Sequence, residues 1–231
     1  MTIHFRDAGK QTFSTMKKFC DLKPNFHVLD IGCQLGRLAI HFAKFLNNDG
    51  GYDGFDIIGE AISWCKHNIA AKYPNFNFIL ADIHNGWYNQ SGKFLPHEYK
   101  FPYGDSSFDF VMATSVFTHM FYKEMENYFH EISRVLKKGG QCWFTFTILD
   151  DESLKCLESK ITLEDFKYKF DGFRSTKKDN PEASVAWEEE IIKKLCKECE
   201  LTIKEPILPG SWRGVKRQTP LWQDIVIATK N

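Results

Sequence analysis

Long apolar runs are missing from this chain of 231 residues. No stretch approaches the roughly 18 uncharged residues that a membrane-spanning helix needs. The first residues, MTIHFRDAGKQ, also lack the apolar core of a signal peptide. We therefore expect a soluble cytoplasmic protein that does not insert into a membrane.

A predominant charge of one sign is missing too. Thirty basic residues balance thirty acidic ones, and neither sign forms a long block. A surface that binds DNA, RNA or an anionic membrane needs a basic patch, which this sequence does not offer. We therefore expect no nucleic-acid partner.

The seven cysteines do not form the dense framework of a small disulfide-linked domain. They stand singly in apolar patterns, as is usual in a reducing compartment. Cys196 and Cys199 make the only CxxC pair, with no second CxxC or histidine pair at zinc-binding spacing. Their spacing fits two neighbouring positions on one helix face, so we predict no metal site.

Apolar residues make up 43% of the chain and aromatic residues 15%, enough for one large core. Strand and helix patterns alternate along a single domain, 1–231. Strands are predicted at 27–31, 52–57, 76–81, 108–113, 142–149, 201–206 and 225–229, and helices at 11–22, 35–46, 62–73, 125–136 and 185–199. This order predicts an α/β fold, doubly wound, with a mostly parallel sheet and a terminal antiparallel pair.

Two long polar connections interrupt this pattern, at 84–104 and 151–184. Loops longer than about 12–15 residues are commonly functional, so both are candidate substrate-facing segments. Residues 84–104 also fit a partly helical connector packed on the sheet. Residues 151–184 follow the fifth strand at the ligand-binding edge, where they could fold over an acceptor as a lid.

The residues from Val28 to Ala43, VLDIGCQLGRLAIHFA, pass from an apolar strand through a glycine bend into a helical pattern. Gly32 and Gly36 allow a sharp bend and a close approach to a ligand, while a helix starting near Leu35 would direct its free amides there. Open parallel sheets bind ligands at this edge. The pattern indicates a nucleotide-type cofactor site, although an ordinary strand-to-helix turn shares it.

Acidic residues stand at the ends of the first three predicted strands: Asp30, Asp56 and Asp82. Asp56 comes 24 positions after Gly32, a spacing at which a carboxylate binds ribose hydroxyls. Asp82, beside the apolar Ile83, suits an adenine amino group. Each one alone also fits a helix N-cap. Together we expect them to line one edge of the sheet.

These motifs resemble those of class I S-adenosylmethionine-dependent methyltransferases, from about residue 11 to the end. The resemblance is carried by VLDIGCQLGR, GFDI, LADI, FPYGDSSFDFVMATSVFTHM and EISRVLKKGG. It implies a Rossmann-like sheet of seven strands whose last strand, 225–229, runs antiparallel. It also implies S-adenosylmethionine as the cofactor.

In this family the first motif holds the methionine portion, the second-strand acid the ribose, and the acid after the third strand the adenine. Residues just after the fourth strand lie near the reactive methyl group. The resemblance thus implies these cofactor-binding residues: Asp30, Gly32, Cys33, Gln34, Gly36, Asp56, Ile57, Asp82, Ile83, Thr114 and Ser115.

Gln34 departs from the family pattern D-x-G-x-G-x-G, in which this position is glycine. A side chain here would crowd the cofactor, or strain the backbone if the bend needs a positive φ. A nicotinamide oxidoreductase is an alternative, but Gln34 breaks its G-x-G-x-x-G fingerprint as well. A non-catalytic protein that binds the cofactor is the other alternative.

Methyl transfer from a sulfonium is a direct displacement, which requires alignment and exclusion of water. His119, in SVFTHM after the fourth strand, is our candidate base for an acceptor hydroxyl, and a packed or capping histidine is the alternative. The sequence ATSV after that strand differs from the NPPY signature of relatives that methylate amide or adenine nitrogens. This difference favours an oxygen acceptor.

Trp212 and Arg213, in LPGSWRG, are candidate acceptor-binding residues. A tryptophan face suits a sugar or another flat ring, and arginine suits carboxylate or phosphate. A surface turn anchored by a buried tryptophan is the other interpretation. We predict a methyltransferase that uses S-adenosylmethionine to methylate a hydroxyl of a small-molecule or glycan acceptor.

Overall fold

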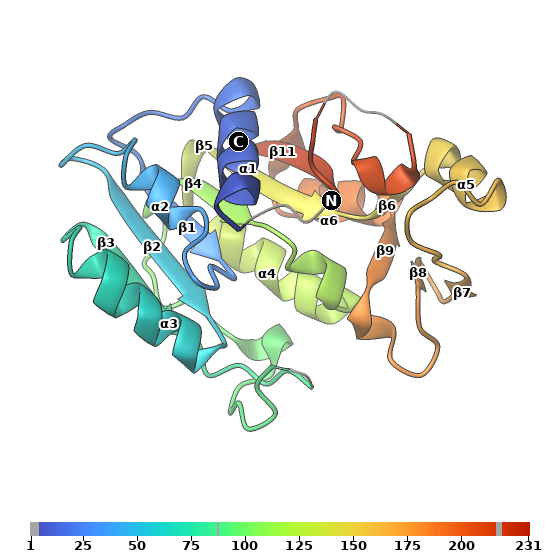
Figure 1. The fold of residues 1–231 in the computed structure, drawn as a ribbon, viewed down its shortest axis with the longest axis horizontal. Helices are drawn as coiled ribbons and strands as arrows, with labels where there is room; N and C mark the ends of the chain where they lie inside the picture. Colours follow the sequence, from blue (N-terminus) through green and yellow to red (C-terminus); the bar gives the residue numbers. More distant parts are fainter. Residues whose placement is uncertain (1–4, 87, 216–218) are drawn as a thin grey trace.

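The computed structural model describes residues 5–86, 88–215 and 219–231. Its centre is a seven-stranded sheet in the order β10-β11-β5-β4-β1-β2-β3 (Figure 1). The strands are β1 His27–Ile31, β2 Gly51–Asp56, β3 Phe76–Leu80, β4 Phe108–Ala113, β5 Leu136–Phe146, β10 Leu201–Ile203 and β11 Asp224–Lys230. Strands β1 to β5 pair in parallel, whereas β11 runs antiparallel to β5 and β10. The predicted doubly wound sheet with a final antiparallel strand is confirmed.

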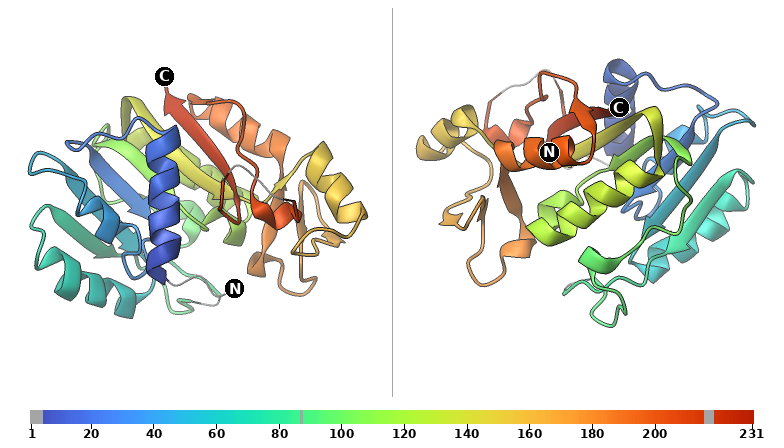
Figure 2. Two further views of the ribbon diagram at one scale, coloured as in Figure 1. Left: turned by 45° about the horizontal axis from the view of Figure 1, so that its top comes forward. Right: turned by 180° about the vertical axis from the view of Figure 1, so that it is seen from behind.

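Helices cover both faces of this sheet (Figures 1 and 2). Side chains alternate along β1, so that Val28 packs under one group of helices and Leu29 and Ile31 under the other. The first group is α1 (Phe5–Phe19), α2 (Ala39–Phe42) and α3 (Gly59–Cys65), which continues as the π-helical turn η1 (Lys66–Ala70). The second is α4 (Tyr122–Val135) and α6 (Glu189–Glu198).

The helix predicted over 35–46 is wrong in length, because only the four residues of α2 are α-helical. Gln34 and Gly36 have φ angles of 46° and 66°, so the chain forms turns before it becomes helical. The helix predicted over 185–199 is wrong at its start. Its apolar first residues form the strand β9 (Val185–Glu188), and α6 follows directly.

A smaller sheet continues from the carboxyl end of β5, in the order β6-β9-β8-β7 (Figure 1). Its other strands are β6 (Ile148–Leu149), β7 (Tyr168–Lys169) and β8 (Phe173–Ser175). The segment 151–184 is therefore more regular than the sequence indicated. It also contains α5 (Asp151–Glu158) and the short 3-10 helix η4 (Pro181–Ala183).

In the described part of the chain, no helix combines the length and apolarity needed to cross a membrane. The same residues contain no group of three or more His, Cys, Asp or Glu side chains placed to hold a metal ion. The seven cysteines are buried free thiols, and Cys196 and Cys199 belong to the core between the sheet and α4 and α6.

Candidate active site

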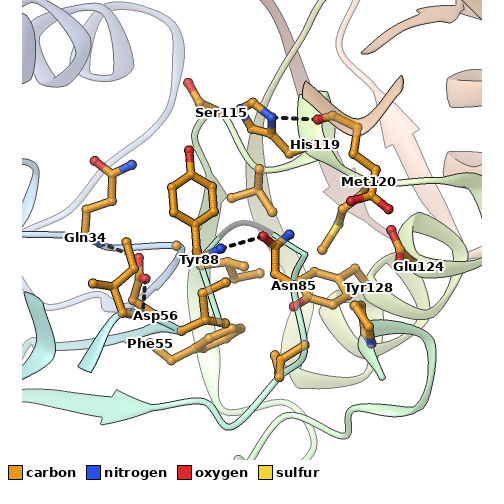
Figure 3. A pocket seen from close by; sticks show the side chains of 18 of the residues that line it. Gln34, Phe55, Asp56, Asn85, Tyr88, Ser115, His119, Met120, Glu124 and Tyr128 are labelled. Atoms are coloured by element: carbon orange, nitrogen blue, oxygen red, sulfur yellow. Dashed lines mark hydrogen bonds between the residues drawn. The ribbon is translucent and has the colours of Figure 1, made fainter. Parts of the chain in front are cut away.

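A pocket of about 280 Å³ lies at the carboxyl ends of the central strands (Figure 3). Its walls come from the loops that follow β1, β2, β3 and β4, from the first two turns of α4, and from η4. In the sheet, β1 lies between β4 and β2. The pocket is thus at the topological switch point, where doubly wound sheets bind their ligands.

The glycine loop after β1 approaches this pocket with a positive φ at three alternate residues. Gly32, Gln34 and Gly36 have φ angles of 73°, 46° and 66°. A Cβ on Gly32 would lie only 2.8 Å from Cγ2 of Val116, so this position requires glycine. Gln34 carries the positive φ that we considered a source of strain. Its N–H donates to Oδ2 of Asp56 at 2.7 Å, which holds the bend.

Asp56, the last residue of β2, connects this loop to the floor of the pocket. Its Oδ2 accepts the Gln34 N–H, and its Oδ1 accepts the Ile58 N–H at 2.9 Å. The residue is 5% exposed, and burial raises the pKa of its carboxyl group. The side chain lines the pocket together with Ile57, which places hydrogen-bond acceptors beside an apolar surface.

Asp30 and Asp82 do not belong to the described pocket lining. Asp30 precedes the last residue of β1, so alternation turns it toward a sheet face, where it accepts a hydrogen bond from the Tyr52 hydroxyl. Burial raises its pKa to about 7. Asp82 forms an ion pair with Lys93 at 3.4 Å and is 40% exposed, while its neighbour Ile83 lines the pocket. The three acids stand at the carboxyl ends of their strands, but only Asp56 belongs to the described pocket lining.

Thr114 and Ser115 line the pocket at the end of β4. Ser115 has a φ of 59°; its N–H donates to Oγ1 of Thr145 at 2.7 Å and its hydroxyl to Oε1 of Gln223 at 2.8 Å. Sequence reasoning missed Gln223, because no local pattern marks a glutamine that reaches across 108 positions. The buried Oγ1 of Thr114 has no hydrogen-bond partner among the described residues.

His119 ends the 3-10 helix η3 (Phe117–His119) and lines the pocket. Its Nδ1 lies 3.0 Å from the main-chain carbonyl oxygen of Glu182 (Figure 3). A carbonyl oxygen can only accept, so Nδ1 carries a hydrogen, and in the neutral form of the ring the lone pair is then on Nε2. The imidazole is thereby oriented with an acceptor nitrogen available.

Trp212 and Arg213 lie elsewhere, 0% and 1% exposed and outside the described pocket lining. Nε1 of Trp212 and Nε of Arg213 donate to the two carboxylate oxygens of Asp224 at 2.8 and 2.9 Å. Nη1 of Arg213 also pairs with Asp150 at 2.7 Å. Their geometry is that of the buried anchor, and it offers no support for the acceptor-binding role predicted from their chemistry.

The connection 84–104 contributes His84, Asn85, Gly86, Tyr88 and Pro96 to the pocket lining, and residue 87 is outside the described residues. The segment 151–184 contributes Glu182. A neighbouring pocket adds two more residues of this segment to the surface around His119, Lys177 and Ala183.

The remaining lining residues that sequence reasoning missed include Met120, Glu124 and Tyr128. Oε2 of Glu124 accepts the Phe121 N–H at 2.8 Å, which fixes this carboxylate at the start of α4. Cys33 lies outside the described lining, with its side chain packed near Gly54.

Comparison with known proteins identifies the class to which this chain belongs. Residues 22–218 match the Methyltransferase domain family (Methyltransf_31). The chain belongs to this family and has the class I, Rossmann-like fold of S-adenosylmethionine-dependent methyltransferases, which several solved structures share. The cofactor is therefore S-adenosylmethionine rather than a nicotinamide dinucleotide.

Two curated relatives show the range of the sequence similarity. The chain is 23% identical over 134 residues to the "Probable cobalt-precorrin-6B C(15)-methyltransferase (decarboxylating)" of Thermoplasma acidophilum, covering 56% of this chain and 58% of that protein. It is 28% identical over 148 residues to Sterol 24-C-methyltransferase ERG6B of Gibberella zeae, covering 62% and 34%. The matches thus span about half, or less, of these relatives.

The PH0226 protein from Pyrococcus horikoshii OT3 has a similar crystal structure, with a TM-score of 0.65 and 16% identity. The similarity covers 100% of this chain and 92% of that one. At this level of identity, the comparison shows that the two proteins share a fold.

The residues of the pocket fit S-adenosylmethionine in four respects. Asp56 keeps acceptor capacity for ribose hydroxyls, since each oxygen already accepts one N–H and a carboxylate oxygen has room for more. Ile57 and Ile83 provide apolar surface for a purine. Gly32 leaves space where a Cβ would collide, and the unpartnered Oγ1 of Thr114 marks a polar position that a ligand can satisfy.

Proposed function

We propose that this protein methylates a hydroxyl group of a small-molecule or glycan acceptor, with S-adenosylmethionine as the methyl donor. The observation that carries the proposal is the orientation of His119. Its Nδ1 is tied to the Glu182 carbonyl at 3.0 Å, and the ring lines the pocket at the end of β4. A base so placed is useful for an acceptor that loses a proton on methylation.

S-adenosylmethionine, when bound, supplies a methyl group on a positively charged sulfur, from which a nucleophile can displace it. In our proposal Asp56 holds the ribose, Ile57 and Ile83 flank the adenine, and Thr114 and Ser115 lie near the methyl group. His119 Nε2 takes the hydroxyl proton as the acceptor oxygen attacks. Because the displacement is direct, the residues contribute chiefly alignment and exclusion of water.

A carbon acceptor is the second candidate. The names of both curated relatives describe C-methyltransferases, one of them acting on sterols. The pocket is compatible with an apolar acceptor, since Val116, Met120 and Pro96 contribute to its lining. In this case His119 would take a proton from carbon after the methyl group is attached.

A methylation assay distinguishes these proposals. The chain is incubated with S-adenosylmethionine labelled with carbon-13 in the methyl group and with a panel of phenols, sugars and sterols. The chemical shift of the labelled methyl group then identifies an oxygen or carbon attachment. Binding of the cofactor without turnover of any acceptor would instead support a non-catalytic cofactor-binding protein.

His119→Ala tests the role of the imidazole. We expect kcat to fall by roughly 10²–10⁴-fold, the usual contribution of a general base, with the Kd for S-adenosylhomocysteine unchanged. His97→Ala is the matched control, because His97 belongs to the same pocket-facing connection as Tyr88 but does not line the described pocket. Unchanged turnover in His119→Ala would remove the base from the proposal.

A further inference from the structure

The pocket wall opposite Gln34 and Asp56 carries two further carboxylates. Glu124 comes from the first turn of α4 and points toward the cavity in Figure 3, and Glu182 comes from η4. Neither forms an ion pair with any described residue, and no lysine or arginine belongs to the described lining of this pocket. Among the described residues, this wall is therefore acidic and carries no lysine or arginine, while Lys177 lines the neighbouring pocket together with Glu182.

A hydrogen bond fixes the carboxylate of Glu124, and another fixes the main chain of Glu182. Glu124 accepts the Phe121 N–H at 2.8 Å, and the main-chain carbonyl of Glu182 accepts from His119 at 3.0 Å. Burial raises the pKa of Glu124, and the nearby charge of Glu182 raises it further, while His97 and His84 act in the opposite direction. Two carboxylates whose charges repel each other favour a bound cation beside them.

Tyr128 provides an independent indication of a ligand on the same wall. The residue is 3% exposed and lines the pocket, and its hydroxyl has no hydrogen-bond partner among the described residues. Because the residue lines the pocket, this hydroxyl is available to a ligand bound there. The ring of Tyr88 faces the cavity from the other side, and aromatic faces attract organic cations (Figure 3).

We propose that the acceptor is a hydroxyl-bearing amine, whose ammonium group binds between Glu124 and Glu182 while its hydroxyl reaches His119. This inference rests on the proposed methylation of oxygen. An ammonium nitrogen has no lone pair, and neighbouring carboxylates favour its protonated form. The two carboxylates therefore orient the acceptor and also direct methyl transfer to its oxygen rather than to its nitrogen.

The step is balanced without a further reactant. The oxygen lone pair forms the new bond to the methyl carbon, the carbon–sulfur bond breaks with its electrons going to sulfur, and the hydroxyl proton passes to His119 Nε2. The ammonium group keeps its protons throughout. Neither Glu124 nor Glu182 exchanges a proton, so both act as positioning residues.

Calorimetry on the full chain saturated with S-adenosylhomocysteine tests the inference. The probes are tyramine, which carries an ammonium group, para-ethylphenol, its neutral analogue, and para-hydroxyphenylpropionate, its anionic analogue. We expect tyramine to bind about tenfold more tightly than para-ethylphenol, and the anion to bind most weakly.

Glu124→Gln and Glu182→Gln should each reduce the preference for tyramine to about threefold or less. Both variants keep the local structure, because a glutamine oxygen still accepts the Phe121 N–H and the main chain of residue 182 still accepts from His119. Glu126→Gln is the matched control, since this carboxylate is on α4 but outside the described pocket lining. It should leave the preference unchanged.

The outcomes separate the two proposals. Failure to bind S-adenosylhomocysteine overturns the proposed function and the inference with it. Normal binding of that ligand, combined with equal or unmeasurable binding of tyramine and para-ethylphenol, overturns the acceptor class alone. A preference for tyramine that survives in both Glu124→Gln and Glu182→Gln overturns the assignment of these two residues.

Discussion

Asp56→Asn replaces one oxygen of the buried carboxylate with an NH2 group and otherwise preserves its shape. In the native protein both oxygens accept main-chain hydrogen bonds, from Gln34 at 2.7 Å and from Ile58 at 2.9 Å. An asparagine can satisfy only one of these donors. Its NH2 group must face the other N–H, so the substitution is not conservative at this position.

The expected magnitudes follow from these contacts. A buried donor left without a partner costs about 1–3 kcal/mol, and hydrogen bonds to a charged group are stronger than neutral ones. Burial raises the pKa of Asp56, so removal of the charge recovers part of its desolvation cost. We expect a net loss of about 1 kcal/mol in the free energy of unfolding. Affinity for S-adenosylhomocysteine should fall roughly 10- to 100-fold, as the ribose hydroxyls lose a charged acceptor.

Denaturant titration and calorimetry with S-adenosylhomocysteine measure the two effects. Asp82→Asn is the matched control: its carboxylate is 40% exposed and pairs with Lys93, so the unfolding free energy should change by less than about 1 kcal/mol and the affinity by a few-fold at most. The reasoning is refuted if Asp56→Asn binds the ligand as tightly as the native protein. It is also refuted if Asp82→Asn loses as much affinity as Asp56→Asn.

Four further substitutions, at three positions, test the fold around the site. Burial raises the pKa of Asp30 from 3.8 to about 7, so the folded chain binds a proton that the unfolded chain releases, and this group's contribution to stability falls as pH rises across that interval. In denaturant titrations, the free energy of unfolding of Asp30→Asn relative to that of the native protein should therefore increase by up to about 4 kcal/mol between pH 4 and pH 8. Gln34→Gly should change the unfolding free energy by less than about 1 kcal/mol, because relief of the positive φ is offset by the freedom of glycine in the unfolded chain. Gln34→Val should lower the unfolding free energy by about 2 kcal/mol, because a β-branched residue is strained at a positive φ. Arg213→Ala leaves the buried Asp224 without its cation and should cost about 3–5 kcal/mol, with little change in ligand affinity per folded molecule.

The main sheet could be predicted from the sequence because its strands are short apolar runs separated by helical spacing. The errors occurred where one local pattern fits two structures. Residues 185–199 read as a continuous helix, yet Val185–Glu188 pairs with β8 and β6. These residues form a strand rather than a helix because they pair within the smaller sheet, and the local spacing of apolar residues does not reveal such pairing. The positive φ of Gly36 likewise shortens α2 without any change in its apolar spacing.

The cofactor half of the site was only partly predictable, because acids near the ends of neighbouring strands lie at different depths along the sheet: Asp30 is level with Gly54, two positions before Asp56. Asp56 is the last residue of β2 and lines the pocket, whereas Asp30 precedes the last residue of β1 and contacts Tyr52. Asp82 lies two positions beyond β3 and turns to Lys93. Strand ends predicted to within a residue or two cannot separate these three cases.

The acceptor half depends on contacts between distant segments, which explains why sequence reasoning found His119 but not its partner Glu182, 63 positions away. Contacts between distant segments also explain why the structure does not support Trp212 and Arg213 as acceptor-binding residues. Asp224 begins the apolar strand β11, and a carboxylate buried at such a position needs a cation and N–H donors from nearby. Arg213 and Trp212 supply both. The acid at the start of this buried strand, Asp224, was therefore the sequence signal that Arg213 pairs with a buried carboxylate and does not bind a ligand.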